Sequence, residues 1–207
     1  MTQKRIAILL TAAIFAVVAI ALIWGFSTRN KFVTLDEDVN RQWSQVENQY
    51  QRRLDLIPNL VETVKGYAAH ESQTFENVTR ARAGLSDAYN EASELRDAAV
   101  PATEQELDKF NQAQQQLGKA LSIYVNAVRE AYPDLKANEQ FRDLQTQLEG
   151  TENRISTERG RYIEQVRNFN VSVRRFPASV VASICGFDVK PQFKADEGAA
   201  SAPKVQF

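Results

Sequence analysis

Apolar residues form one unbroken run near the start of the chain, and beyond it they recur at helical spacing. Residues 6–26 read IAILLTAAIFAVVAIALIWGF and contain no charged side chain. At about 1.5 Å per residue, a helix of this length spans about 30 Å, which matches the hydrocarbon core of a bilayer. We therefore predict a transmembrane helix, anchored by Ile6, Leu10, Phe15, Ile20, Trp24 and Phe26.

A cleaved signal peptide is the competing interpretation of this run. Its apolar core would cover only about 7–15 residues and would precede an A-x-A-like cleavage site, and no such site follows here. Lys4 and Arg5 on one flank are balanced by Arg29 and Lys31 on the other. The positive-inside rule therefore leaves the orientation open, and we take the N-terminus as cytoplasmic.

Four later segments carry apolar side chains at intervals of three and four residues, the period of an amphipathic helix. Capping boxes at residues 34–37 and 103–106 predict two helix starts, the first after a short polar link over residues 27–33. Helices with apolar stripes and short links bury those stripes against one another. The sequence predicts an all-α fold, an antiparallel four-helix bundle behind the transmembrane helix, with these predicted helix starts: residues 34, 70, 103 and 135–139.

Three parts follow from this pattern. We predict an anchor with its link over residues 1–30, a bundle over residues 31–187 and a flexible tail over residues 188–207, which is rich in small and helix-breaking residues. Residues 178–187 carry apolar side chains behind two arginines, which fits either an interfacial amphipathic segment or a short helix that closes the base of the bundle. The last three residues, Val205 to Phe207, fit either a captured terminal carboxylate or a frayed end.

Residues 52–67, RRLDLIPNLVETVKGY, combine a helical apolar stripe with two features that a plain core helix lacks. Pro58 lies in the helix interior, where it removes an amide donor, so a bend is expected there. Arg53 falls on the apolar stripe, as Glu158 does on the last long helix. If the first bundle helix rises from residue 34 and the last descends to residue 176, the two lie at one height. We predict an internal ion pair between Arg53 and Glu158.

The opposite face of the same segment is polar. Arg52, Asp55, Asn59 and Glu62 repeat at three and four residues and form a stripe on one side of the helix. Such a stripe is either a solvated face or a docking surface. We treat these four residues as the candidate partner-docking site.

The composition and net charge of the chain argue against several classes of function. The formal net charge is −1, whereas a general nucleic-acid binder needs a basic excess, so we expect no nucleic-acid partner. Cys185 is the only cysteine and His70 the only histidine, which excludes an internal disulfide and a His-rich zinc site. Acidic residues alternate with basic ones, and no phosphate-binding loop or nucleophile elbow is present. We expect no catalytic residues, metal or cofactor.

Several spaced motifs make the chain similar to one family. RRLDLIPNLVETVKGY at 52–67 resembles a signature of the LemA family of bacterial membrane proteins, and further matches follow along the chain: ARA at 81–83, YP at 132–133, LKA at 135–137, LEGTENRI at 148–155, RFP at 175–177, GF at 186–187 and APKV at 202–205. The resemblance implies a single-pass anchor in the bacterial inner membrane that carries a helical bundle. It offers no catalytic residues, and it implies a role beside membrane-bound quality-control proteases of the HtpX type.

The leading functional hypothesis is a non-enzymatic, membrane-tethered scaffold or adaptor, whose partners are the lipid bilayer and an HtpX-type protease. An alternative is a membrane-organising protein that assembles into homo-oligomers. A third is an unrecognised hydrolase, which would need a polar pocket with titratable groups of perturbed pKa.

Overall fold

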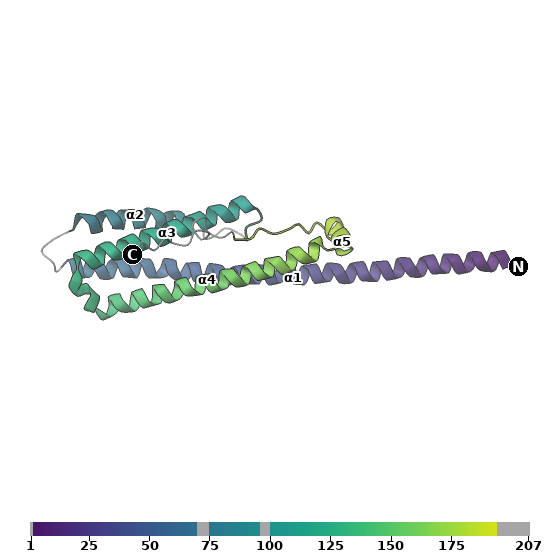
Figure 1. Cartoon of the computed structure of the whole chain (residues 1–207), viewed down its shortest axis with the longest axis horizontal. Helices are drawn as coiled ribbons and strands as arrows, with labels where there is room; N and C mark the ends of the chain where they lie inside the picture. Colours follow the sequence, from purple (N-terminus) through teal and green to yellow (C-terminus); the bar gives the residue numbers. More distant parts are fainter. Residues whose placement is uncertain (1, 70–74, 96–99, 194–207) are drawn as a thin grey trace, which may run out of the picture. The chain divides into compact units, whose positions relative to one another are not determined.

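The chain is all-α. The computed structural model describes residues 2–69, 75–95 and 100–193, with side chains from residue 8 onward, and no strand occurs in these ranges (Figure 1). The elements are α1 (Thr2–Ala68), α2 (Glu76–Glu94), α3 (Glu104–Ala131), the 3-10 helix η1 (Pro133–Ala137), α4 (Glu139–Arg174) and α5 (Ala178–Cys185). The predicted all-α helical bundle with an apolar N-terminal helix is confirmed.

Most predicted helix boundaries coincide with the signals that predicted them. At the start of α3, the Glu106 amide donates to Thr103 Oγ1 at 3.2 Å, and the Glu106 carboxylate accepts from the Thr103 amide at 3.2 Å, so the capping box is formed. α3 ends before Pro133 and α4 ends before Pro177, since proline cannot continue the hydrogen-bond ladder.

The predicted helix start at Thr34 is wrong, as is the predicted link over residues 27–33. α1 is continuous from Thr2 to Ala68, and Thr34 Oγ1 donates to the carbonyl oxygen of Asn30 at 3.1 Å, as threonine does inside a helix. Because the helix already reaches Thr34 from the apolar run, carbonyl groups of the preceding turn satisfy the amides and no cap is needed.

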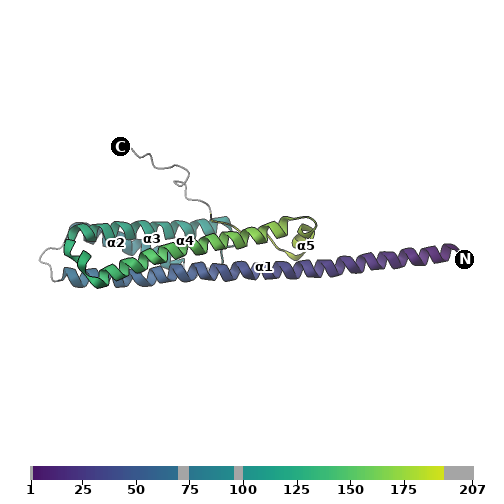
Figure 2. The ribbon, with the colours of Figure 1, turned by 60° about the horizontal axis from the view of Figure 1, so that its bottom comes forward.

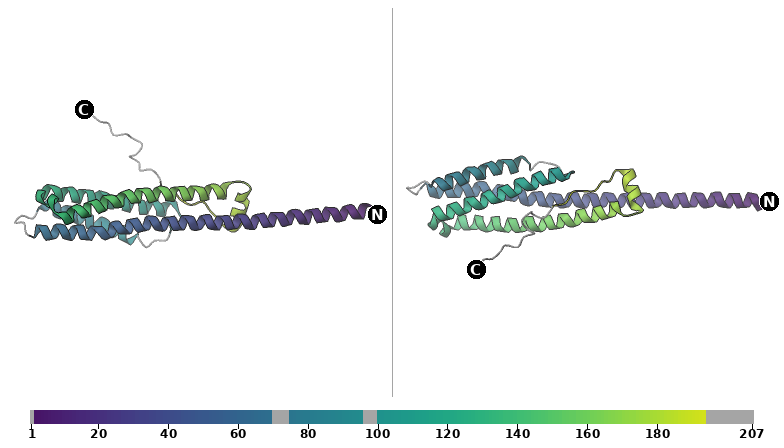
Figure 3. Two further views of the ribbon diagram at one scale, coloured as in Figure 1. Left: turned by 90° about the horizontal axis from the view of Figure 1, so that it is seen from below. Right: turned by 45° about the horizontal axis from the view of Figure 1, so that its top comes forward.

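The chain forms two compact units. The first comprises Met1–Arg41 and Glu164–Lys190, and the second comprises Gln42–Ile163 and Pro191–Phe207. In the second unit, segments of α1, α2, α3 and α4 run side by side (Figures 2 and 3).

The core of the second unit follows the predicted apolar stripes. Each helix contributes buried side chains, among them Ile57, Leu60, Val64, Leu85, Leu117, Tyr124, Val128, Phe141 and Leu148. Leu54 and Leu56, which lie off the predicted stripe, are buried as well. α1 therefore buries a wider face than a two-helix seam requires, as a bundle helix does.

The chain after α5 contributes to a second buried group, a cluster of aromatic rings around Trp43. The Trp43 ring lies 5.2 Å from Phe110, 5.2 Å from Tyr162 and 6.1 Å from Phe193, between centroids. Phe193 is buried, so the predicted flexible tail is wrong for residues 188–193. The rest of that tail, including the Val205 to Phe207 terminus, lies outside the described residues.

Tyr162 provides a test of this cluster. Its side chain is buried and its hydroxyl has no hydrogen-bond partner among the described residues, and burial raises the pKa of Tyr162 to about 12. We expect Tyr162→Phe to raise the free energy of unfolding slightly at pH 8, because an unpaired buried hydroxyl is costly.

The free energy of unfolding of Tyr162→Phe should also decrease less at high pH than that of the wild type. The pKa of Tyr162 is about 12 in the folded chain and 10 in the unfolded chain, so the unfolded chain releases its phenol proton more readily. As the pH rises from 10 to 12, this difference lowers the free energy of unfolding. At pH 11, the wild-type chain should lose about 1 kcal/mol more than Tyr162→Phe. Denaturant titrations at both pH values measure this, and equal losses would contradict the assignment.

In the first unit, the apolar part of α1 is exposed. By length and composition α1 is the one helix of the described chain that could cross a bilayer, and its most apolar window is entirely unburied. Of the predicted anchor residues, Leu10, Phe15, Ile20, Trp24 and Phe26 are exposed, and the side chain of Ile6 lies outside the described set. Phe176, to which the last long helix was predicted to extend, lies beyond α4, which ends at Arg174, and its side chain is exposed.

Candidate functional site

An open polar groove of about 830 Å³ lies in the second unit between α1 and the start of α4. From α1 it is lined by Asn59, Glu62, Thr63, Gly66 and Tyr67, and from the other side by Asn138, Gln140, Asp143, Leu144 and Gln147. Helical periodicity explains both walls, since residues three and four apart share one face of a helix. Asn138 also fixes the start of α4, because its Oδ1 accepts from the Phe141 amide at 3.0 Å.

The four predicted docking residues are all exposed, and two of them line this groove. Asn59 and Glu62 belong to its α1 wall, whereas Arg52 and Asp55 lie on α1 outside it. Pro58, next to Asn59, lies inside the continuous helix, and the bend expected there stays a prediction.

The exposed residues on the α1 side make short contacts within their own helix. The Asn59 side-chain amide donates to the Asp55 carbonyl at 3.3 Å, and Lys65 Nζ lies 3.3 Å from the Glu62 carboxylate. Exposed pairs of this kind contribute little free energy, so the side chains can exchange them for contacts with a partner.

The α4 wall was not predicted from the sequence. The signal was present, since Gln140, Asp143 and Gln147 recur at three and four residues on the polar side of the last helix. It was indistinguishable from any solvated helix face until α1 was placed beside it. Two carboxylates, Glu62 and Asp143, line the groove and no lysine or arginine does, so the lining is negatively charged, with amide side chains that both donate and accept hydrogen bonds.

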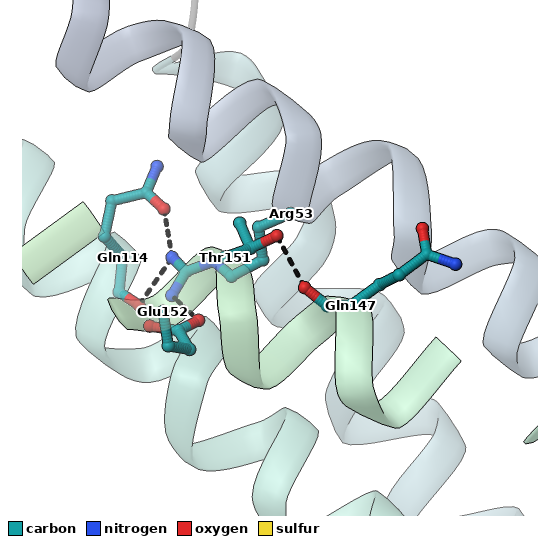
Figure 4. Close-up of polar contacts among 5 residues, drawn as sticks. All are labelled: Arg53, Gln114, Gln147, Thr151 and Glu152. Atoms are coloured by element: carbon teal, nitrogen blue, oxygen red, sulfur yellow. Dashed lines mark hydrogen bonds and ion pairs between the residues drawn. The ribbon is translucent and has the colours of Figure 1, made fainter. Parts of the chain in front are cut away.

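Behind this surface, Arg53 is buried in a polar network (Figure 4). Its Nη1 donates to Glu152 Oε1 at 2.8 Å, and its Nη2 donates to the Gln114 carbonyl at 3.1 Å and also to the Gln114 side-chain oxygen. The guanidinium carbon lies 5.2 Å from the centroid of the Tyr50 ring. Arg53 thus links α1 to both α3 and α4.

The predicted ion pair between Arg53 and Glu158 is wrong. Glu158 instead accepts a hydrogen bond from Gln42 Nε2 at 2.7 Å and pairs with Arg161 at 2.7 Å. The predicted height rested on a helix start at Thr34, which does not exist. Because α1 runs through that point, α4 is displaced along it and Glu152, six positions earlier in α4, reaches Arg53.

Groups with raised pKa lie away from the groove. Burial raises the pKa of Glu47 and of Tyr50, and it raises the pKa of Tyr124 to about 12. None of these residues lines the groove. Within the described ranges, no group of three or more His, Cys, Asp or Glu residues is placed to hold a metal ion, and His70 lies outside those ranges.

Comparison with known proteins gives one family and a set of named relatives. The family model described as the LemA family matches residues 42–207, a region that contains both walls of the groove. Magnetosome proteins MamQ 1 and MamQ 2 of Paramagnetospirillum magneticum are each 28% identical to this chain over 168 residues. Magnetosome protein MamQ of Magnetospirillum gryphiswaldense is 28% identical over 174 residues.

These matches cover 76% of this chain and 61% of each relative. The chain therefore spans less than two thirds of the length of the relatives it matches. Neither the family description nor the relatives' names state an enzymatic activity.

Proposed function

Because the chain belongs to the LemA family and carries an exposed apolar stretch in the helix that builds the groove, we propose that it is a membrane-anchored, non-enzymatic scaffold or adaptor. The continuity of α1 is the observation that carries this proposal. The first part of α1 exposes leucine, isoleucine and phenylalanine side chains. Such a large apolar surface is unfavourable in water, and burial in a bilayer removes it from water. We place the anchor as a single pass in the bacterial inner membrane.

The second part of the proposal concerns what the groove binds. A wall with two carboxylates, several amide groups and no basic side chain favours a protein segment that supplies lysine, arginine or amide donors. An HtpX-type membrane protease is the candidate that the family resemblance suggests. The relatives are named as magnetosome proteins, and their names state no binding partner.

Photo-crosslinking in cells tests this function. A photoreactive amino acid at Asn59 lies in the groove, and the same substitution at Asn153 gives a matched exposed position on α4 outside it. We expect mass spectrometry to find a protein adduct at Asn59 that is absent at Asn153. Identical adducts at both positions would contradict docking in the groove, and adducts with a second copy of the chain would favour the self-assembling alternative.

Charge reversal tests the chemistry of the groove. The double variant Glu62→Lys/Asp143→Lys should lower the adduct yield from Asn59 at least about tenfold, because it replaces attraction with repulsion toward a basic segment. Asp87→Lys/Glu91→Lys on α2 makes the same change in net charge on exposed residues away from the groove. An equal loss in this control, with helicity preserved in both variants, would mean that net charge and not the groove governs binding.

A further inference from the structure

α5 carries an exposed apolar stripe. Phe176, Val180 and Ile184 follow one another at intervals of four residues, and they are 80%, 51% and 79% exposed. The opposite side of α5 faces its own unit, where Ala182 is 3% exposed. α5 and the turn before it thus expose three large apolar side chains, Val180 and Ile184 on the helix and Phe176 in the turn.

The stripe is held firmly in position. Gly186 ends α5 in the left-handed conformation at φ 73°, and the Phe187 amide donates to the Ala182 carbonyl at 3.0 Å. This turn brings the Phe187 ring to 5.4 Å from Phe32 on α1 and 6.4 Å from Phe169 on α4.

The chain beyond the turn is tied to the same unit. Asn170 Oδ1 accepts from the Lys190 amide and Asn170 Nδ2 donates to the Lys190 carbonyl, each at 2.8 Å. Lys190 Nζ pairs with Asp36 at 2.7 Å. The chain that follows α5 is therefore tied to both α1 and α4, which holds the C-terminal end of α5 in place.

The contact with Phe32 gives the height of α5 along α1 (Figures 1 and 2). Phe32 lies six residues after Phe26, the end of the apolar run, which is about 9 Å along a helix. The headgroup layer of a bilayer is about 5–8 Å thick on each side. If residues 6–26 span the hydrocarbon, the contact between Phe187 and Phe32 lies at the outer edge of the headgroup layer.

The segments that lead up to this contact, as far as Asp36 and Asp188, carry only basic charges. Residues 27–35 and 168–187 contain Arg29, Lys31, Arg174 and Arg175 and no aspartate or glutamate. The first acidic residues after these segments are Asp36 and Asp188. All four basic residues are exposed, which suits a leaflet with anionic headgroups.

We propose that α5 is an interfacial lipid-binding element, whose stripe of Phe176, Val180 and Ile184 enters an anionic leaflet beside α1. The proposal rests on the membrane anchor proposed above. The occupant is the bilayer because the stripe lies on the same unit as the exposed apolar run of α1, close to the end of that run and among exposed basic residues. The anchor and α5 together would restrain the tilt of α1 at the membrane surface, which a single helix alone does not do.

Cys185 makes a direct test possible. It is the only cysteine in the chain, and it is exposed next to Ile184. The full chain is reconstituted in vesicles of phosphatidylcholine and phosphatidylglycerol, and Cys185 carries an environment-sensitive fluorophore. We expect a blue shift of its emission and strong quenching by lipids that carry a quencher near the headgroup.

Two control positions in a Cys185→Ser background separate the possible failures. Ile14→Cys reports insertion of α1, and Ser122→Cys reports an exposed position on α3. Quenching at Ile14→Cys without quenching at Cys185 would overturn the role of α5 and leave the anchor intact. No quenching at either would overturn the anchor as well, and equal quenching at Ser122→Cys would overturn a specific role for α5.

Two variants separate the apolar contribution to membrane binding of α5 from the electrostatic one. Val180→Asp/Ile184→Asp should abolish the quenching at Cys185 in all vesicles, because both side chains are exposed and the core is unchanged. Arg174→Gln/Arg175→Gln should weaken membrane partition of α5 about fivefold per charge, and only when phosphatidylglycerol is present. Loss of equal size in pure phosphatidylcholine would contradict the electrostatic part of the proposal.

Discussion

Replacing Gln114 with leucine is expected to lower the free energy of unfolding by about 2 kcal/mol, because a buried cation loses a hydrogen bond. Arg53 is 3% exposed, and its Nη2 bonds only to oxygens of Gln114, while Nη1 is held by Glu152. Leucine fills a similar volume and keeps the backbone carbonyl, but its side chain accepts no hydrogen bond, so one N–H of the buried guanidinium loses its acceptor. Denaturant unfolding of the full chain, followed by circular dichroism, measures the loss.

A second substitution should reverse this loss. In Arg53→Met/Gln114→Leu the charge is gone along with its partner, and an apolar pair of similar size often equals or exceeds a buried polar network in stability. The double variant is therefore expected to be about as stable as the wild type. The difference between the double variant and the sum of the single variants gives the coupling directly.

Gln116→Leu is the matched control, since Gln116 is exposed on the same helix. It should change the free energy of unfolding by no more than about 0.5 kcal/mol. If the changes in the free energy of unfolding caused by Arg53→Met and Gln114→Leu were additive, the two residues would not be coupled. A Gln114→Leu variant as stable as the wild type would also contradict the network.

The Arg53 network shows what periodicity can and cannot predict. Arg53 was expected on the buried face of α1 with a carboxylate partner from the last long helix, and both features are observed. The identity of that carboxylate depends on the relative displacement of α1 and α4. Periodicity fixes which face of a helix is buried and is unchanged when the helix slides along its neighbour, so it cannot distinguish Glu152 from Glu158.

In the groove, too, one part was predicted from the sequence and the other part was not. Asn59 and Glu62 were predicted because they stand opposite a strongly apolar stripe on α1. Asp143 and Gln147 lie on a helix whose polar face extends over many turns, and only the packing of α4 beside α1 selects these turns. One helix therefore specifies half of a site between two helices, and the fold specifies the rest.

Phe193 is a harder case for sequence reading, because it stands alone in a segment without periodicity. It follows Pro191, and its neighbours are lysines, small residues and helix breakers, which is typical of a mobile tail. An extended segment that contributes one aromatic ring to a core has no repeating pattern to detect. Its burial depends on packing against Trp43 of α1 and Tyr162 of α4, which only the fold brings together.

Replacing Phe193 with alanine is therefore expected to lower the free energy of unfolding by about 3 kcal/mol. The variant loses ring contacts with Trp43 and Tyr162, whose centroids lie 6.1 Å and 5.5 Å from that of Phe193. It also loses the Arg159 guanidinium 4.4 Å above the ring, which contributes about 0.5–1 kcal/mol in such settings. Denaturant unfolding of the full chain in detergent measures the effect, in a Trp24→Phe background so that the emission comes from Trp43 alone.

Phe176→Ala removes the same side chain from an exposed position and should change the free energy of unfolding by about 0.5 kcal/mol or less. If both alanine variants were equally stable, Phe193 would not belong to the core. If Phe193→Ala is destabilising and Phe176→Ala is not, the segment that follows α5 is part of the fold. Residues 188–193 then form part of the folded domain. Deleting them would remove a buried side chain and would destabilise the bundle.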